Sequence, residues 1–144
     1  YINNTIQNIR NNFASYTPKG DMGAKKSFLW LRKGKCLAML MDQKLNEGQV
    51  VNFLGLPAKT ATGIAELAIR MNIDIVPMKI LRNEHSSYDI VFYKKIDYEK
   101  NSSKHDKIIS KILIDINQTI GDWILKNPSQ WLWIHRRWEK DLYK

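Results

Sequence analysis

The sequence predicts an α/β fold, and two patterns in it support this prediction. Apolar residues recur at spacings of three and four in several segments, which is typical of amphipathic helices. Between these segments stand short, continuous apolar runs that indicate buried strands. Helices that alternate with such strands form layered domains. With 144 residues the chain is long enough for one sizeable core, so we expect a single domain over residues 1–144.

Two helices and a strand are predicted in the N-terminal part of the chain. The first helix extends to about Ser15, where residues 17–20 break it. Asp21 is expected to cap the second helix, and the Lys-Gly-Lys sequence at 33–35 to end it. The apolar run 36–41 follows directly and predicts a buried strand. One face of the first helix carries Ile2, Ile6, Ile9 and Phe13.

The middle of the chain is expected to contain a short strand, a turn and a helix. Residues 50–54 are predicted to be extended, and the Gly-Leu-Pro sequence at 55–57 to form a turn. Either Thr60 or Thr62 is expected to cap the helix that follows. Asn72 is expected to end that helix in the left-handed conformation.

A hairpin and a long helix are predicted in the last half. Residues 74–81 read as a strand that Pro77 interrupts, and residues 88–93 as the strand that returns beside it. The helix is predicted to begin at one of the serines at 102–103 and to end before Asn127 and Pro128. Its apolar face comprises Ile108, Ile109, Ile112, Leu113, Ile116, Ile120 and Trp123.

The charge of the chain favours an anionic partner, since 23 Lys and Arg against 14 Asp and Glu leave a net charge of +9. An anionic bilayer, an acidic carrier protein and a phosphorylated substrate all fit. Nucleic acid is not expected as a partner, because the basic residues are dispersed and no DNA- or RNA-binding motif is present. The scattered histidines and the single Cys36 give no zinc spacing, so neither a metal nor a cofactor is expected. No apolar run approaches the roughly 20 residues that a membrane-spanning helix needs.

The segment after the predicted strand at 36–41 combines an acid with a turn-rich sequence. Asp42 and Gln43 stand at the end of that strand, where α/β folds usually build their sites. The Gly, Pro and Thr residues at 55–63 lead into a helix, an arrangement that resembles an anion-binding corner with unpaired backbone amides. The alternative is a tight turn followed by a helix cap.

Four blocks of the sequence resemble the late acyltransferases of lipid A biosynthesis, in order and in approximate spacing. Together they cover nearly the whole chain. The blocks are Asp42-Gln43, then Phe53-x-Gly55-x-Pro57-Ala58-x-Thr60-x-x-Gly63, then Val76-Pro77, and finally the tail from Pro128 to Trp138.

This resemblance implies a glycerophosphate acyltransferase-like layered fold, of which the chain would form the C-terminal half, a mixed sheet flanked by helices. It also implies transfer of a fatty acyl chain, lauroyl or similar, from acyl carrier protein to a lipid A precursor at the cytoplasmic face of the inner membrane. In that family a His-x4-acid pair deprotonates the acceptor hydroxyl, which then attacks a thioester. Such a reaction requires no metal.

The family's catalytic pair is missing from this sequence. Ile90, Ser110 and Lys140 stand five residues after the three histidines, so no histidine begins a His-x4-acid motif. In the family that motif lies upstream of every block matched here. We therefore expect the chain to be inactive by itself.

The resemblance carries over two residues with a catalytic role. Arg10 matches an essential arginine that is expected to donate to the thioester oxygen or to a substrate phosphate; its alternative is a surface helix residue. Asp42 is expected to orient active-site partners; its alternative is a turn cap. Six further residues are expected to bind substrate: Gln43, Thr60, Thr62, Gly63, Arg136 and Arg137.

The tail from Gln130 to Lys144 interleaves tryptophan with arginine. Indole and guanidinium groups suit a membrane interface, where they meet headgroups and phosphates. Core packing is the rival explanation, and we expect some tryptophans of each kind. His135, like His85 and His105, is expected to be structural. A second hypothesis for the whole chain follows, namely a non-catalytic, basic module that binds the membrane periphery.

Overall fold

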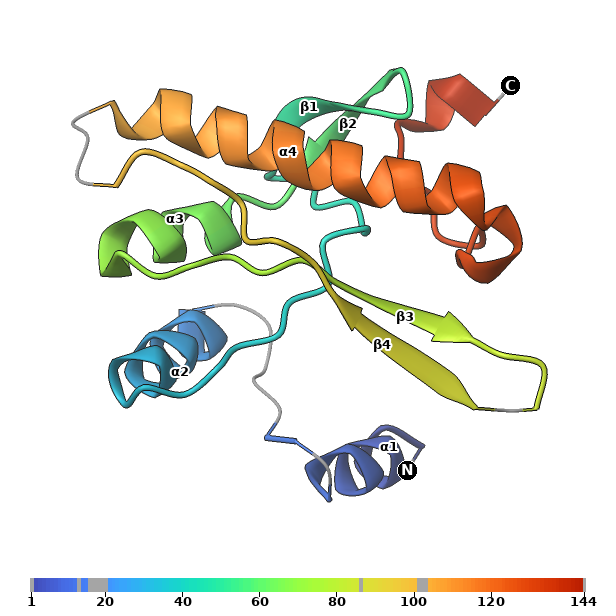
Figure 1. The fold of residues 1–144 in the computed structure, drawn as a ribbon, viewed down its shortest axis with the longest axis horizontal. Helices are drawn as coiled ribbons and strands as arrows, with labels where there is room; N and C mark the ends of the chain where they lie inside the picture. Colours follow the sequence, from blue (N-terminus) through green and yellow to red (C-terminus); the bar gives the residue numbers. More distant parts are fainter. Residues whose placement is uncertain (1, 13, 16–20, 86, 101–103, 144) are drawn as a thin grey trace. The chain divides into compact units, whose positions relative to one another are not determined.

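The computed structural model describes residues 2–12, 14–15, 21–85, 87–100 and 104–143 (Figure 1). The chain divides into two compact units, Tyr1–Met39 and Leu40–Lys144. Helices and small antiparallel sheets make up the described residues, which confirms the mixed α and β composition. The expected mixed sheet is wrong for these residues, since they form two separate two-stranded sheets.

The first unit contains the two predicted helices, α1 (Ile2–Asn11) and α2 (Asp21–Arg32). Helix α1 ends before the predicted Ser15, while Phe13, the break at 17–20 and the side chain of Asp21 lie outside the described residues. Gly34 follows α2 with a φ of 71°, which confirms the glycine stop.

The buried strand predicted at 36–41 is not formed. None of its residues pairs with a strand, Cys36 is exposed, and Leu40 is 82% exposed. Met41 alone is buried. An apolar run shows that a segment favours burial, but a strand also needs a neighbour that supplies its backbone hydrogen bonds, and no described strand does so here.

The second unit begins with a hairpin of β1 (Gln49–Phe53) and β2 (Leu56–Thr60), in which Val51 faces Ala58. Leu54 and Gly55 form the turn with φ values of 53° and 85°, the signature of the tight turn that suits the twist of a hairpin. The Oδ1 atom of Asn52 accepts a hydrogen bond from the backbone N–H of Gly55 at 3.0 Å.

This hairpin changes two sequence expectations. The turn stands one residue earlier than predicted, and Leu56 and Pro57 already belong to β2. Thr60 ends β2 and therefore cannot cap a helix. Thr62 holds the N-cap position of α3 (Gly63–Met71), but no side-chain hydrogen bond caps the helix. Asn72 ends α3 in the left-handed conformation, as predicted.

A second hairpin joins β3 (Met78–Arg82) to β4 (Tyr88–Phe92) in antiparallel register. The predicted strand at 74–81 is too long at its start, because residues 74–77 lie outside β3. Pro77 precedes the strand, where its missing N–H removes no bond from the ladder, and its carbonyl accepts from the N–H of Tyr93 at 3.0 Å.

Helix α4 (His105–Lys126) organises the core of the second unit. Figure 1 shows α4 running along the β1–β2 hairpin. Helix α3 lies beside the N-terminal half of α4. Lys104 precedes the helix, and residues 102–103, where its start was predicted, are not described. The end before Pro128 is confirmed. Its buried apolar residues, as predicted, include Ile108, Ile112, Leu113 and Ile116.

Candidate functional site

Asp42 lies directly after the buried Met41 and is itself partly buried. Its Oδ2 atom accepts a hydrogen bond from the indole Nε1–H of Trp131 at 3.1 Å. The bond joins the loop before β1 to the C-terminal tail, 89 positions away in the sequence. The carboxylate is therefore held in one place by the indole ring of the tail.

Trp131 belongs to an aromatic cluster that also includes Phe53, Trp138 and Tyr143. Phe53 is 1% exposed, and its ring centroid lies 5.8 Å from that of Trp131 and 5.7 Å from that of Trp138. The Nε1–H of Trp138 donates to the backbone carbonyl of Phe53 at 3.1 Å. The aromatic cluster thus packs the tail against β1 by ring contacts and a backbone hydrogen bond.

Arg137 is the most deeply buried charged residue of the described chain, with 1% of its surface exposed. Its Nη1 donates to the carbonyl of Lys59 at 2.8 Å, and its Nη2 donates to Oγ1 of Thr60 at 2.7 Å. A longer contact of 3.4 Å joins Nη2 to Oδ1 of Asn117. The guanidinium carbon stands 4.6 Å from the ring centroid of Phe53, within the range of a cation–π contact.

Among the described residues, no carboxylate forms a hydrogen bond with the guanidinium group of Arg137, whose partners are all uncharged. Burial lowers the pKa of Arg137, while the charges of Asp42 and Tyr143 act to raise it. Because an arginine titrates so far above neutrality, the side chain remains protonated. Asp42 is therefore the carboxylate that offsets the buried positive charge, through space rather than by contact.

The other predicted site residues differ in how far they are buried. Thr60 is fully buried and bonded to Arg137, so both side chains belong to the interior hydrogen-bond network. Gln43 and Arg136 are exposed, whereas Thr62 and Gly63 are partly exposed at the start of α3. Arg10 is an exposed residue of α1, in the first compact unit, whereas Asp42 belongs to the second. The structure thus brings Asp42, Thr60 and Arg137 together through the tail.

The anion-binding corner predicted at 55–63 is not one feature of the fold. Gly55 serves the hairpin turn, whereas Pro57 and Thr60 belong to β2. Only Gly63 stands at a helix N-terminus. Of the alternative, a tight turn followed by a helix cap, the turn is confirmed, but Thr62 at the N-cap position of α3 makes no side-chain hydrogen bond that caps the helix. Residues 56–60 pair with residues 49–53 in the β1–β2 ladder, and the carbonyl of Lys59, which points out of the ladder, accepts from Arg137.

Comparison with known families adds the deciding observation. The sequence model of the bacterial lipid A biosynthesis acyltransferases matches residues 1–140. The chain belongs to this family. No curated protein matches it. The resemblance in the sequence blocks is therefore confirmed, and with it a role in acyl transfer during lipid A synthesis.

Asn117 is a buried member of the Arg137 network of this acyltransferase chain that sequence reasoning missed. It is 1% exposed, and its Nδ2 donates to the carbonyl of Asn52 at 3.0 Å and to Oγ1 of Thr60 at 3.1 Å. A signal was present, since an amide on the otherwise apolar face of α4 needs buried polar partners. Its partners could not be named, because they come from the hairpin and from the tail.

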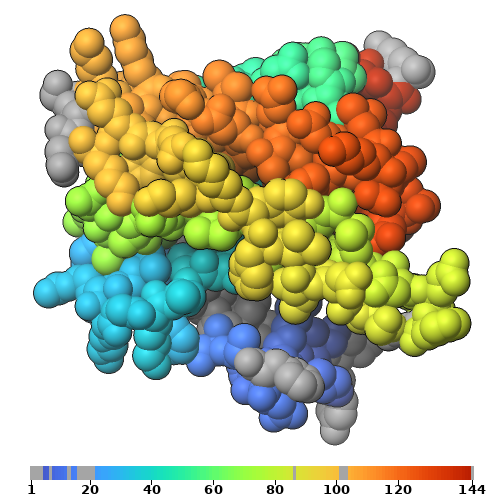
Figure 2. Space-filling model, viewed as in Figure 1, coloured from blue at the N-terminus to red at the C-terminus, as the bar shows by residue number. Residues whose placement is uncertain are grey.

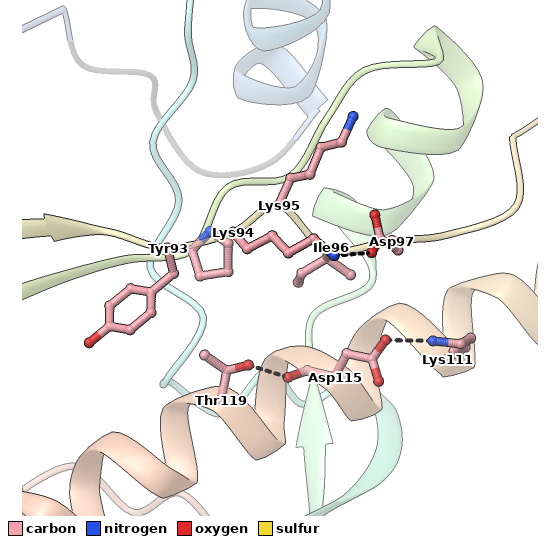
Figure 3. A pocket seen from close by; sticks show the side chains of 9 residues that line it. Tyr93, Lys94, Lys95, Ile96, Asp97, Lys111, Asp115 and Thr119 are labelled. Atoms are coloured by element: carbon pink, nitrogen blue, oxygen red, sulfur yellow. Dashed lines mark hydrogen bonds and ion pairs between the residues drawn. The ribbon is translucent and has the colours of Figure 1, made fainter.

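The pocket in Figure 3 is a separate feature of the acyltransferase chain, with a volume of about 430 Å³. Lys94 pairs with Asp97 at 3.1 Å, and Lys111 pairs with Asp115 at 2.7 Å, so these charges are balanced within the pocket. None of the predicted site residues lines it. The lining comprises Pro77, Tyr93, Lys94, Lys95, Ile96, Asp97, Lys111, Asp115 and Thr119.

The described residues form neither a cluster of metal-binding side chains nor a helix fit to span a membrane. No group of three or more His, Cys, Asp or Glu side chains in these residues is arranged to hold a metal ion. None of the helices found in the same residues combines the length and the apolar character that crossing a bilayer requires.

Proposed function

We propose that this chain forms part of an acyltransferase that moves a fatty acyl group, lauroyl or similar, from acyl carrier protein to a lipid A precursor. The family match over residues 1–140 carries the proposal. The net charge of +9 complements both an acidic carrier protein and an anionic lipid. The reaction takes place at the cytoplasmic face of the inner membrane, on a glycerophosphate acyltransferase-like layered fold to which this chain contributes.

The proposed chemistry needs a proton acceptor that this sequence does not contain. A His-x4-acid pair, supplied by polypeptide outside residues 1–144, removes the proton from the acceptor hydroxyl, and the resulting oxygen attacks the thioester carbonyl. The carbon–sulfur bond then breaks, and the thiolate of the carrier leaves and takes up the proton from the histidine. Positive charge must stabilise the oxyanion during this step, a role that we assign to Arg10.

Asp42 is proposed as a positioning residue in this reaction. Its carboxylate is held by Trp131 and offsets the buried charge of Arg137. A fixed negative charge of this kind orients cationic or hydrogen-bonding neighbours in a site. Gln43, Thr62, Gly63 and Arg136 retain exposed surface for substrate contacts, whereas Thr60 and Arg137 support them from within.

The purified 144-residue chain is expected to transfer no acyl group from acyl carrier protein to a lipid A precursor, because it lacks the general base. Addition of a polypeptide that carries the family's upstream His-x4-acid segment is expected to generate transfer, measured as acylated product by mass spectrometry. Robust transfer by the chain alone would contradict the proposal.

The same reconstitution tests Arg10. Substitution Arg10→Ala is expected to lower turnover by about 100-fold, the usual effect of removing an oxyanion donor. Arg32→Ala serves as the matched control, since Arg32 is an exposed arginine at the end of α2. Equal turnover of the two variants would leave Arg10 as an ordinary surface residue.

Substitution Asp42→Asn separates the charge of Asp42 from its hydrogen bond. An asparagine Oδ1 can still accept from the Trp131 indole, so the free energy of unfolding should decrease only by the lost attraction to Arg137, about 1 kcal/mol. Turnover of the reconstituted enzyme should nevertheless decrease about tenfold, because the negative charge is lost. Asp97→Asn, an exposed acid of the separate pocket, provides the control. Unchanged turnover for Asp42→Asn would reduce the residue to a structural link.

A further inference from the structure

Gln43 lies between two residues that the tail holds in place. Before it, Oδ2 of Asp42 accepts from the Nε1–H of Trp131 at 3.1 Å. After it, Nζ of Lys44 donates to Oε2 of Glu139 at 2.8 Å. Gln43 itself is exposed. We call the three residues from Asp42 to Lys44 the loop segment, which is therefore bound at both ends while its middle side chain faces solvent.

Glu139 binds β2 as well as the loop segment. Its Oε1 atom lies 3.5 Å from Nζ of Lys59, a residue of β2. The side chain of Lys44 is only 20% exposed, so its ammonium group has lost much of its water and needs the carboxylate. The hydrogen bond from Lys44, together with the charge of Lys59, lowers the pKa of Glu139, which is therefore ionised at neutral pH. Figure 2 shows the last residues of the tail, in red, beside the β1–β2 hairpin, in blue-green.

The indole of Trp131 is fixed by its neighbours. Its ring centroid lies 5.8 Å from that of Phe53 and 4.4 Å from that of Trp133. Because these contacts restrict rotation of the ring, the N–H group has one direction and binds one oxygen of Asp42. The other oxygen, Oδ1, has no hydrogen-bond partner among the described residues and remains able to accept from a substrate or a catalytic group.

Secondary structure does not restrain the loop segment, which lies in no helix or strand. The first backbone hydrogen bond of the loop joins the N–H of Leu45 to the carbonyl of Lys59 at 3.4 Å, one residue beyond the segment. A residue outside regular structure keeps its backbone freedom unless other contacts remove it. Trp131 and Glu139 therefore supply the restraint on Gln43.

We propose that Trp131 and Glu139 are positioning residues of the acyltransferase and act through the loop segment. Trp131 directs the second carboxylate oxygen of Asp42 toward the reacting groups. Glu139, through Lys44, presents the side chain of Gln43 to the lipid A precursor. The inference rests on the proposed function, because it takes Asp42 and Gln43 as parts of the site. Neither tail residue needs to touch a substrate for this role.

Nuclear magnetic resonance relaxation of the 144-residue chain tests the restraint without catalysis. In the double variant Trp131→Phe/Glu139→Ala, the backbone order parameter of Gln43 should fall from about 0.85 to below about 0.6. The matched control Trp138→Phe/Asp115→Ala deletes an indole hydrogen bond and a lysine–acid pair of the same kinds elsewhere. It should leave the order parameter of Gln43 unchanged. Equal values in the two double variants would overturn the proposal.

Turnover of the chain reconstituted with the His-x4-acid polypeptide tests the role of Trp131. Trp131→Phe keeps an aromatic ring but removes the N–H donor, and it should lower turnover about fivefold, against less than about twofold for Trp138→Phe. The combination Trp131→Phe/Asp42→Asn should lose about tenfold, no more than Asp42→Asn alone, because both changes remove the same interaction. Independent effects would multiply to about 50-fold. A multiplied loss would overturn the role of Trp131 in positioning Asp42.

The same assay separates binding from turnover for Glu139. Glu139→Ala should raise the KM for the lipid A precursor about fivefold and keep kcat within about twofold, the result expected when a binding contact is lost. Gln43→Ala should raise the KM by a similar factor, and the two changes together should raise it no further. Asp115→Ala is the control and should leave the KM unchanged. An unaltered KM for Glu139→Ala would overturn the role of Glu139.

Failure of this proposal can be distinguished from failure of the proposed function. If the unsubstituted assembly transfers no acyl group, the proposed function is wrong, while the relaxation measurement still decides whether the tail restrains the loop segment. If the unsubstituted assembly transfers acyl groups and Trp131→Phe matches Trp138→Phe in turnover, the proposed function stands and the positioning role of Trp131 is wrong. Circular dichroism of each variant confirms that the fold is retained.

Discussion

Substitution Arg137→Ala is expected to lower the free energy of unfolding by about 3 kcal/mol, measured by urea denaturation. The guanidinium satisfies the carbonyl of Lys59 and the side chains of Thr60 and Asn117, all within the interior. Removal leaves buried oxygens with fewer partners, each at a penalty of about 1 to 3 kcal/mol, and opens a void beside Phe53. The tail should detach from β2 in consequence.

Arg136 provides the control for this experiment, because it is the adjacent residue of the same type but is exposed. Arg136→Ala should change the free energy of unfolding by less than about 0.5 kcal/mol. Fluorescence of the tryptophans offers a second measurement, since release of the tail would expose Trp131 and Trp138 and shift their emission to longer wavelength. Equal stability of the two variants would show that the buried network does not hold the tail.

Substitution Gly48→Ala is expected to destabilise the second unit by about 3 kcal/mol. A Cβ atom at this position would lie 2.5 Å from the carbonyl oxygen of Thr60 and 2.9 Å from that of Leu45. Both obstacles are backbone atoms, so relief of the overlap requires a shift of β2, and overpacking of this kind is costly. The shift would also move Thr60 away from Arg137. Thermal unfolding of the purified variant measures the loss.

Gly121→Ala is the matched control for a glycine in a crowded place. Its added Cβ would meet Cδ2 of Leu54 at 3.1 Å, the movable end of a side chain. The higher helix propensity of alanine, worth about 1 kcal/mol, offsets that contact. We expect a change of less than about 1 kcal/mol. A Gly48→Ala variant as stable as Gly121→Ala would contradict the close approach of the loop to β2.

The two large effects concern the same small region of the second unit. Gly48 allows the loop before β1 to approach the end of β2, and Arg137 binds that end from the tail. Asp42, at the start of the same loop, is bound by Trp131 of the tail. The predicted strand-end acid and the predicted tryptophan–arginine tail are therefore parts of one packed assembly, in which the loop and the tail contact each other and both contact the end of β2.

The sequence by itself determined the elements whose signals are local. The long apolar face of α4, the left-handed Asn72 and the glycine after α2 were all predicted correctly, because periodicity and backbone preference act within a few residues. The family was determined in the same way, since its motifs are linear in the sequence. The single domain, the roles of Arg10 and Asp42 and the substrate residues remain predictions.

Only the tertiary structure decided which segments lie together. The run 36–41 favours burial but finds no strand partner, and Thr60, expected to cap a helix, instead bonds an arginine 77 positions later. Some tryptophans of the tail were predicted to pack in the core and others to remain at the surface, but the sequence did not say which. In the folded tail, Trp131 and Trp138 pack on Phe53, whereas Trp133 is exposed. Hydrogen bonds and ring contacts between distant segments depend on chain topology, which local patterns in the sequence do not specify.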